Sequence, residues 1–153
     1  MRTEGKIQPF NDSYYADYVD LRNQVYPQHP TSIIGEKHAD RTRGKKIYIQ
    51  RRGVCNNNTL SAALVIEQWE DAYHPDKYVM NIFVHPEHEQ KGMGKLLYNY
   101  MEELLLPRNP IKITSEVWEP HIQSIRFLKR RGFELAATEK ECRIDLQKYD
   151  PKV

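Results

Sequence analysis

The stretch Ile-Phe-Val-His-Pro-Glu-His-Glu-Gln-Lys-Gly-Met-Gly-Lys, residues 82–95, carries the strongest structural signal in this sequence. It joins the end of an apolar run of buried-strand length, residues 78–84, to a polar turn that contains Gly92 and Gly94. Helical periodicity begins at once after the turn. The apolar residues on one helical face are Met93, Leu96, Leu97, Tyr100, Met101, Leu104 and Leu105. We therefore predict a strand, a turn and an amphipathic helix.

The predicted turn has the composition of an anion-binding site. Two glycines let the backbone approach a ligand without obstruction by a Cβ atom. The first amides of a helix have no intrahelical acceptor, and the helix dipole adds partial positive charge there. Lys91 and Lys95 add full charges. Together these features favour a pyrophosphate, although a glycine-containing turn before a core helix would look similar.

The spacing excludes the two commonest phosphate-binding loops. Leu97 stands where a dinucleotide-binding fingerprint requires its third glycine, and Leu96 follows Gly94-Lys95 where a P-loop requires Ser or Thr.

The flanking sequence predicts the rest of the domain. Upstream we expect a helix over residues 11–25, a short helix over 36–40, a strand over 46–50, a turn over 52–58 and a strand over 60–69. Downstream we expect a strand over 111–117, a helix from Pro120 that ends at Gly132, and a final hairpin over 133–138 and 141–146. In the helix that begins at Pro120, Ile122, Ile125 and Leu128 are expected to form the buried face. Gly132 is expected to occupy the left-handed C′ position. Two strand–helix units require at least one parallel strand pair.

The predicted fold class is therefore α/β (α+β), with a mixed, mostly antiparallel sheet of about six to seven strands and about four helices. One domain is expected to span residues 1–153, since no linker or repeat interrupts the chain.

Composition excludes several function classes. A net charge of +2 is too small to demand nucleic acid, and no apolar stretch approaches the length of a membrane span. The first residues lack the apolar core of a signal peptide, so we expect a cytoplasmic protein without membrane partners. Cys55 and Cys142 form no paired motif, and His85 and His88 lack a third ligand cluster at zinc spacing, so no metal is expected.

Two segments resemble a known family. VHPEHEQKGMGKLL, residues 84–97, resembles motif A of the GNAT superfamily of N-acyltransferases. VWEPHIQSIRFLKRRGFE, residues 117–134, resembles the second conserved segment of that family. The two segments are in register, and the order of strands and helices agrees over residues 7–146.

The resemblance implies an arrangement for acetyl-CoA. The strands over 78–84 and 111–118 would splay apart, with the cofactor between them and an amine acceptor entering from the opposite side. Backbone groups of 82–84 would pair with pantetheine, and the amides of 90–95 would hold the pyrophosphate. The cofactor-binding residues implied are Ile82, Phe83, Val84, Gln90, Lys91, Gly92, Met93, Gly94, Lys95, His121 and Phe127.

Three positions depart from the family pattern. Glu89 stands where Arg or Gln is usual, and His121 stands where Asn is frequent. Leu128 replaces the Tyr that is thought to protonate the leaving thiolate in many members. His121 can still donate a hydrogen bond to pantetheine.

Amine acylation requires a neutral amine, so a group must accept its proton. The candidates are Glu67, and Asn81 acting through a bound water, with His121 as an alternative acid for the thiolate. Glu67 is equally compatible with a plain surface strand position. The predicted function is acetyl transfer from acetyl-CoA to a primary amine of a small molecule or a peptide. The alternative is a non-catalytic acyl-CoA-binding regulatory module, motivated by Leu128.

The two ends of the sequence suggest an assembly. LRNQVYPQHPTS, residues 21–32, and DLQKYDPKV, residues 145–153, resemble the first half of tandem GNAT proteins. A second GNAT domain would then follow Asp150-Pro151. A free-standing module would instead cover its edge strand by forming a homodimer.

Overall fold

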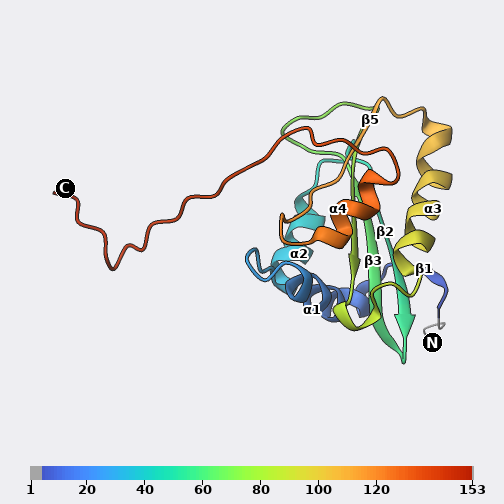
Figure 1. Cartoon of the computed structure of the whole chain (residues 1–153), viewed down its shortest axis with the longest axis horizontal. Coiled ribbons are helices and arrows are strands. Elements are labelled where there is room, and N and C mark those ends of the chain that lie inside the picture. Colours follow the sequence, from blue (N-terminus) through green and yellow to red (C-terminus); the bar gives the residue numbers. More distant parts are fainter. Residues whose placement is uncertain (1–4, 153) are drawn as a thin grey trace. The chain divides into compact units, whose positions relative to one another are not determined.

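The computed structural model describes residues 5–152, which divide into two compact units (Figure 1). The first unit extends to Glu116 and contains every strand found in the described residues. The second unit begins at Val117 and contains a single helix, α4 (Ile122–Lys129). The prediction of one domain over 1–153 stays a prediction.

The first unit is built on a five-stranded sheet in the order β1-β2-β3-β4-β5. The strands are β1 (Ile7–Pro9), β2 (Ile49–Asn56), β3 (Thr59–Glu67), β4 (Lys77–Val84) and β5 (Lys112–Thr114). Every neighbouring pair is antiparallel except β4 and β5, which are parallel. The mixed, mostly antiparallel sheet is confirmed, with five strands in residues 5–152 rather than the six to seven expected.

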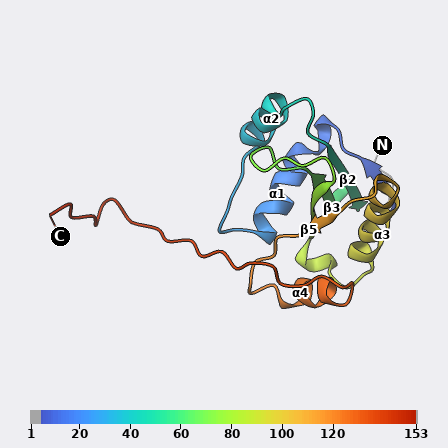
Figure 2. The same cartoon turned by 90° about the horizontal axis from the view of Figure 1, so that it is seen from above.

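Helices cover both faces of this sheet, as Figure 2 shows. α1 (Tyr15–Val25) and α2 (Ile33–Thr42) lie on one face, and α3 (Met93–Leu105) lies on the other. α3 is the crossover that a parallel β4–β5 pair requires. Short 3-10 turns, Asp12–Tyr14, Pro86–His88 and Leu106–Arg108, flank α1 and α3. With α4, the expected four helices are confirmed.

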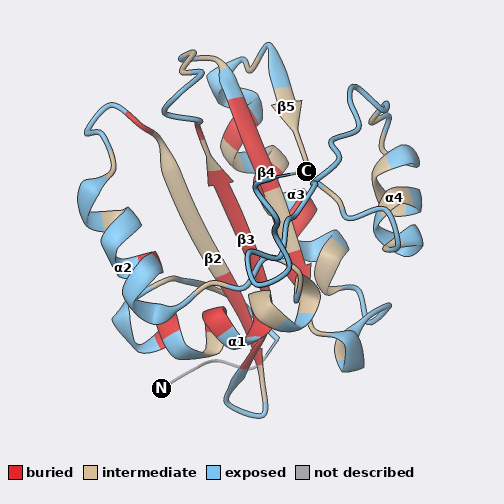
Figure 3. Ribbon diagram, turned by 90° about the vertical axis from the view of Figure 1, so that its left-hand side faces the viewer, coloured by how far each residue is buried: buried red, intermediate tan, exposed pale blue. Residues whose placement is uncertain are grey.

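The central strands are buried because both of their faces are covered, as Figure 3 shows for β3 and β4. Successive residues of a strand point to opposite faces. On the α1 side Ala63, Val65 and Phe83 pack with Tyr18 and Leu21. The intervening residues of β3 therefore face α3, whose Leu97, Met101 and Leu105 are buried.

The predicted turn over residues 52–58 is wrong, because β2 continues through Asn56. Only Asn57 and Asn58 form the turn, with φ of 50° and 60°, the left-handed values that suit a tight hairpin. Gly53 belongs to the strand. A Cβ there would lie 2.5 Å from Leu60 Cδ1, so close packing rather than a turn explains the glycine.

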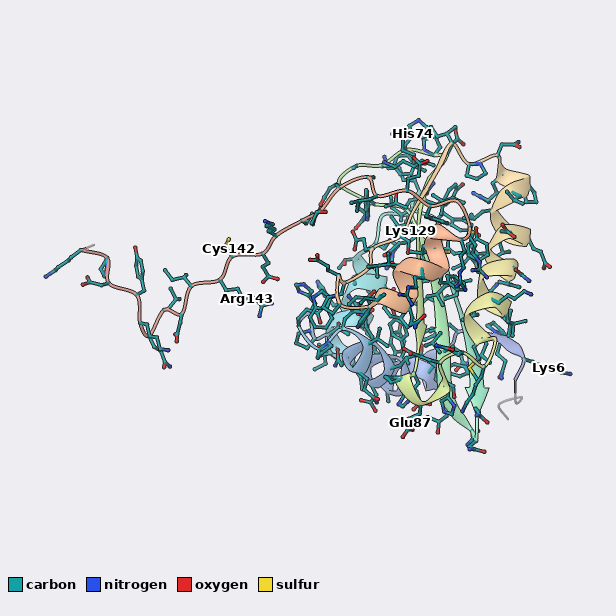
Figure 4. All side chains as sticks on the ribbon, in the orientation of Figure 1. Lys6, His74, Glu87, Lys129, Cys142 and Arg143 are labelled. Atoms are coloured by element: carbon teal, nitrogen blue, oxygen red, sulfur yellow. The ribbon has the colours of Figure 1, made fainter. Side chains whose placement is uncertain are left out.

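The predicted final hairpin is also wrong, because residues 133–146 form neither strand nor helix in the structure. Leu135, Ile144 and Leu146 are exposed by 81%, 63% and 76%. Apolar alternation produces a strand only where a neighbouring strand offers hydrogen bonds, and residues 117–152 form no strand. Figure 4 labels Cys142 and Arg143 on this segment.

α4 differs from its prediction on one point and agrees on another. The expected buried face is wrong, because no residue of α4 is buried. Described by itself, the second unit has no other helix or strand through Lys152 against which α4 could bury a face. The helix end is confirmed: Gly132 has φ +85°, its N–H donates to Lys129 O, and Phe133 N–H donates to Leu128 O.

Candidate functional site

The sheet opens between β4 and β5. Their pairing is limited to Lys77–Val79 with Lys112–Thr114, and β4 continues to Val84 without β5 beside it. Just past the last pair, the Glu116 N–H donates to the Asn81 side-chain oxygen at 3.3 Å. The edge of β4 beyond this point, Ile82–Val84, is where an extended ligand could add like a strand.

The turn after β4 sets the start of α3. His85 caps its first part, because its Nδ1 accepts from the Glu87 N–H at 3.2 Å. Gln90 and Gly92 then take left-handed φ values of 58° and 85°. A Cβ on Gly92 would meet no atom within 4 Å, so the glycine is favoured by backbone conformation and not by lack of space.

Gly94 has a different explanation, since it lies inside α3 and is not among the residues with positive φ. A glycine there costs about 1 kcal/mol relative to alanine. Helix geometry does not require it, whereas close approach of a ligand to the backbone would.

The N-terminus of α3 has no side-chain cap, because Gly92 occupies the cap position. The first helical hydrogen bond joins Leu96 N–H to Gly92 O at 2.9 Å. The preceding amides, those of Met93, Gly94 and Lys95, therefore have no helical acceptor. Lys91 folds back instead, and its Nζ donates to Glu87 O at 3.0 Å. Figure 4 places Glu87 at the end of the sheet where β4 finishes.

Glu67 and Asn81, the candidate catalytic residues on the strands, lie on one face of the sheet. Val65 pairs with Asn81, and Glu67 pairs with Val79, so the two side chains are diagonal neighbours on adjacent strands. This is the face that α1 covers, because Val65 packs in the α1 cluster. Burial raises the pKa of Glu67, against the opposing effect of Arg43 and other arginines. Its side chain is 33% exposed, so the carboxyl is reachable.

A network of ion pairs, which the sequence analysis did not predict, links α1 and α2 to this face. Glu36 and Asp40 of α2 both bind Arg51 of β2, and Glu36 also binds Arg22 of α1. The network reaches the site through Arg43, whose guanidinium lies 2.6 Å from Asp40 and 4.0 Å from Glu67.

The ion-pair network changes the pKa of Asp40. Burial by itself would raise the pKa of Asp40, but hydrogen bonds from Tyr15, Arg43 and Arg51 lower it overall. Burial, reinforced by the hydrogen bond to Asp40, raises the pKa of Tyr15 to about 12. The sequence feature that could have indicated this network is the four-residue spacing of Glu36 and Asp40, which places both on one side of a helix.

Arg51→Ala is expected to destabilise the protein by about 2–3 kcal/mol. Removing one partner of a buried pair leaves the other charges uncompensated, and the partial exposure of Asp40 and its bond to Arg43 reduce the cost. Denaturant unfolding measures the change, with Arg41→Ala, which removes an exposed arginine of α2, as the control. Equal midpoints for the two variants would contradict this assignment.

His121 and Phe127 belong to the second unit. His121 occupies the N-cap position of α4 without a side-chain capping hydrogen bond, and its ring lies 5.3 Å from that of Trp118. The guanidinium of Arg131 stacks 3.5 Å from the ring centroid of Phe127. Their part in binding acetyl-CoA stays a prediction.

Within residues 5–152, no three His, Cys, Asp or Glu side chains gather closely enough to hold a metal ion. None of the helices in that range combines the length and apolar character of a bilayer span.

Comparison with known proteins identifies the family. The chain matches the family model "Acetyltransferase (GNAT) family" over residues 10–133 and belongs to this family of enzymes. No curated protein sequence matches it significantly.

Solved structures share the fold. An aminoglycoside 6'-N-acetyltransferase from Acinetobacter haemolyticus superposes with a TM-score of 0.65 at 18% identity, covering 92% of this chain and 99% of its own. The ribosomal-protein-S18-alanine N-acetyltransferase from Escherichia coli gives 0.66 at 17% identity, covering 86% and 79%. A third, the aminoglycoside N-acetyltransferase AAC(6')-Iy in complex with CoA, gives 0.66 at 15% identity, covering 91% and 93%.

Proposed function

We propose that this chain transfers an acetyl group from acetyl-CoA to the primary amine of a small molecule or a peptide. The observation that carries the proposal is the separation of β4 from β5 beyond Val79. The unpaired part of β4 leads along the chain to the turn with Gly92 and to the N-terminus of α3, which has no side-chain cap. The free edge of β4 can bind an extended ligand arm. The N-terminus of α3 can bind a diphosphate. A solved structure of the same fold, AAC(6')-Iy, contains CoA.

In this proposal the pantetheine arm lies along Ile82–Val84 and the pyrophosphate lies over the amides from Gln90 to Lys95. Backbone donors give most of the affinity for the phosphates, so the exposed Glu89 is tolerated. The family resemblance further implies that His121 and Phe127 contact the pantetheine arm.

The reaction needs a base for an alkylammonium group. Glu67, whose pKa burial raises, accepts the proton directly or through a water held by Asn81. The neutral amine attacks the thioester carbonyl, the C–N bond forms, and collapse of the tetrahedral intermediate breaks the C–S bond. The thiolate leaves and takes a proton from His121 or from water.

The experiment that tests the function is a screen of primary amines for release of free CoA, with acetyl-CoA as donor. The panel should include small diamines, amino acids, aminoglycosides and short peptides, because the relatives named above act on both small-molecule and protein amines according to their names. Binding of acetyl-CoA is measured in parallel by calorimetry. Binding without turnover of any amine would favour the non-catalytic acyl-CoA-binding module.

Leu128→Tyr is expected to raise kcat, by up to about 100-fold, because it restores a general acid for the thiolate. Leu128 lies near the end of α4 and is only partly exposed. CoA release measures the effect once an acceptor is known, and Leu128→Phe is the control for ring size. If Leu128→Tyr changes nothing while His121→Ala causes a large loss, His121 is the acid instead.

A further inference from the structure

A pocket of about 110 Å³ lies at the closed end of the β4–β5 opening. Its lining residues are Trp69, Ala72, Lys77, Tyr78, Val79, Lys112 and Thr114. Trp69, two residues after Glu67, is 44% exposed and gives the pocket an apolar wall. Among these lining residues, the charged ones are Lys77 and Lys112.

Lys77 and Lys112 are direct partners in the parallel register. Successive residues of a strand point to opposite faces, so register partners such as these have their side chains on the same face of the sheet. Within residues 5–152, neither ammonium group has a carboxylate within 4.0 Å. The two positive charges therefore have no carboxylate partner among the described residues, and both would attract an anion bound in the pocket.

The pocket lies beside the candidate base. Lys77, Val79 and Asn81 alternate on one face of β4, and Glu67 is the β3 partner of Val79. The phosphate-binding turn is far away, because Lys77 and Val84 are the two ends of β4 and the strand spans about 23 Å. Figure 4 shows the same separation, with His74 and Glu87 at opposite ends of the sheet.

We infer that Lys77 and Lys112 bind a carboxylate of the acceptor, so that the acceptor is an amine that also carries a carboxylate. The inference rests on the proposed function. Two ammonium groups hold the carboxylate, Trp69 covers the adjacent carbon chain, and the amine points along β4 toward Glu67 and Asn81. The same two charges repel polycationic acceptors.

Matched amines test this inference: L-lysine against cadaverine, and L-tyrosine against tyramine, each pair differing only in the carboxylate. We expect the amino acids to have at least about tenfold higher kcat/KM, which corresponds to about 1.4 kcal/mol. The double variant Lys77→Gln, Lys112→Gln should lose this preference through a rise in KM with kcat retained. Lys77→Glu, Lys112→Glu should prefer cadaverine and tyramine. Lys45→Gln, an exposed lysine outside the pocket, is the control.

A binding readout separates this inference from the proposed catalysis. In a Trp118→Phe background, Trp69 is the only tryptophan, so L-lysine binding changes its fluorescence without any turnover. Binding that is lost in the double Gln variant supports the carboxylate site even if no amine is acetylated.

Equal kcat/KM within each amine pair, or unchanged L-lysine binding in the double variant, overturns the inference. Weaker acetyl-CoA binding in that variant also overturns it, because the lysines would then serve the CoA phosphates. Aggregation of Lys112→Gln with unchanged acceptor preference would assign this lysine to protection of the edge strand β5.

Discussion

Gly94→Glu is expected to abolish the binding of acetyl-CoA, with affinity falling more than about 100-fold, or about 2.7 kcal/mol. The side chain would fill the space over the first turn of α3 and place a negative charge where the amides and the helix dipole favour an anion. The fold should survive, because Gly94 has an ordinary helical conformation and glutamate is a better helix former than glycine. Calorimetry with acetyl-CoA measures the loss.

Two controls separate size, charge and folding. Gly94→Ala adds a single methyl group over the backbone and should weaken acetyl-CoA binding much less than glutamate does, while the thermal midpoint should rise slightly. Gly94→Gln has nearly the size of glutamate without its charge, so its affinity should lie between the other two. Unchanged affinity in a folded Gly94→Glu protein would remove the pyrophosphate from this turn.

Glu67→Gln is expected to lower kcat by about 10²–10⁴-fold, the usual contribution of a general base, while acetyl-CoA affinity stays unchanged. An unperturbed Glu titrates near a pKa of about 4.3, and burial raises the pKa of Glu67. The rising acid limb of kcat/KM should therefore lie at higher pH than that of an ordinary glutamate. In Glu67→Gln this limb should disappear.

The contribution of Glu67 to stability should change with pH in the direction opposite to its contribution to activity. A carboxyl whose pKa is raised by folding binds its proton more tightly in the native state, so stability falls as pH rises through its range. Glu67→Gln cannot ionise and should lack this part of the pH dependence, as denaturant midpoints at several pH values would show. Glu103→Gln, an exposed glutamate of α3, is the control for both measurements. Full activity in Glu67→Gln would refute its role as the base.

Arg43 connects these two results, because it lies 4.0 Å from Glu67 while it binds Asp40 at 2.6 Å. Its positive charge opposes the rise in the pKa of Glu67 that burial causes. If Glu67 is the base, the position of α2 on the sheet would affect the reaction through this guanidinium group. The same ion pairs link α2 to α1 and to β2, so the proposed role of Glu67 predicts that Arg51→Ala lowers activity as well as stability.

Local sequence determined the strand–turn–helix unit from β4 to α3. Strand and helix periods, two glycines and a change of period at Met93 are properties of neighbouring residues, and the structure confirms both elements. The end of α4 at Gly132 was predictable for the same reason, since a left-handed residue after a helix favours glycine. The family followed from two such local segments.

Only the tertiary structure decided which side chains share a face of the sheet. The pairing of Lys77 with Lys112, and the placing of Glu67 diagonal to Asn81, depend on strand register, which joins residues far apart in the sequence. The meeting of Arg51 with Glu36 and Asp40 depends on how α2 packs. Residues 133–146 show the converse, because their alternation predicted strands that the structure lacks. A strand needs a partner for its backbone hydrogen bonds, and periodicity within a segment cannot supply one.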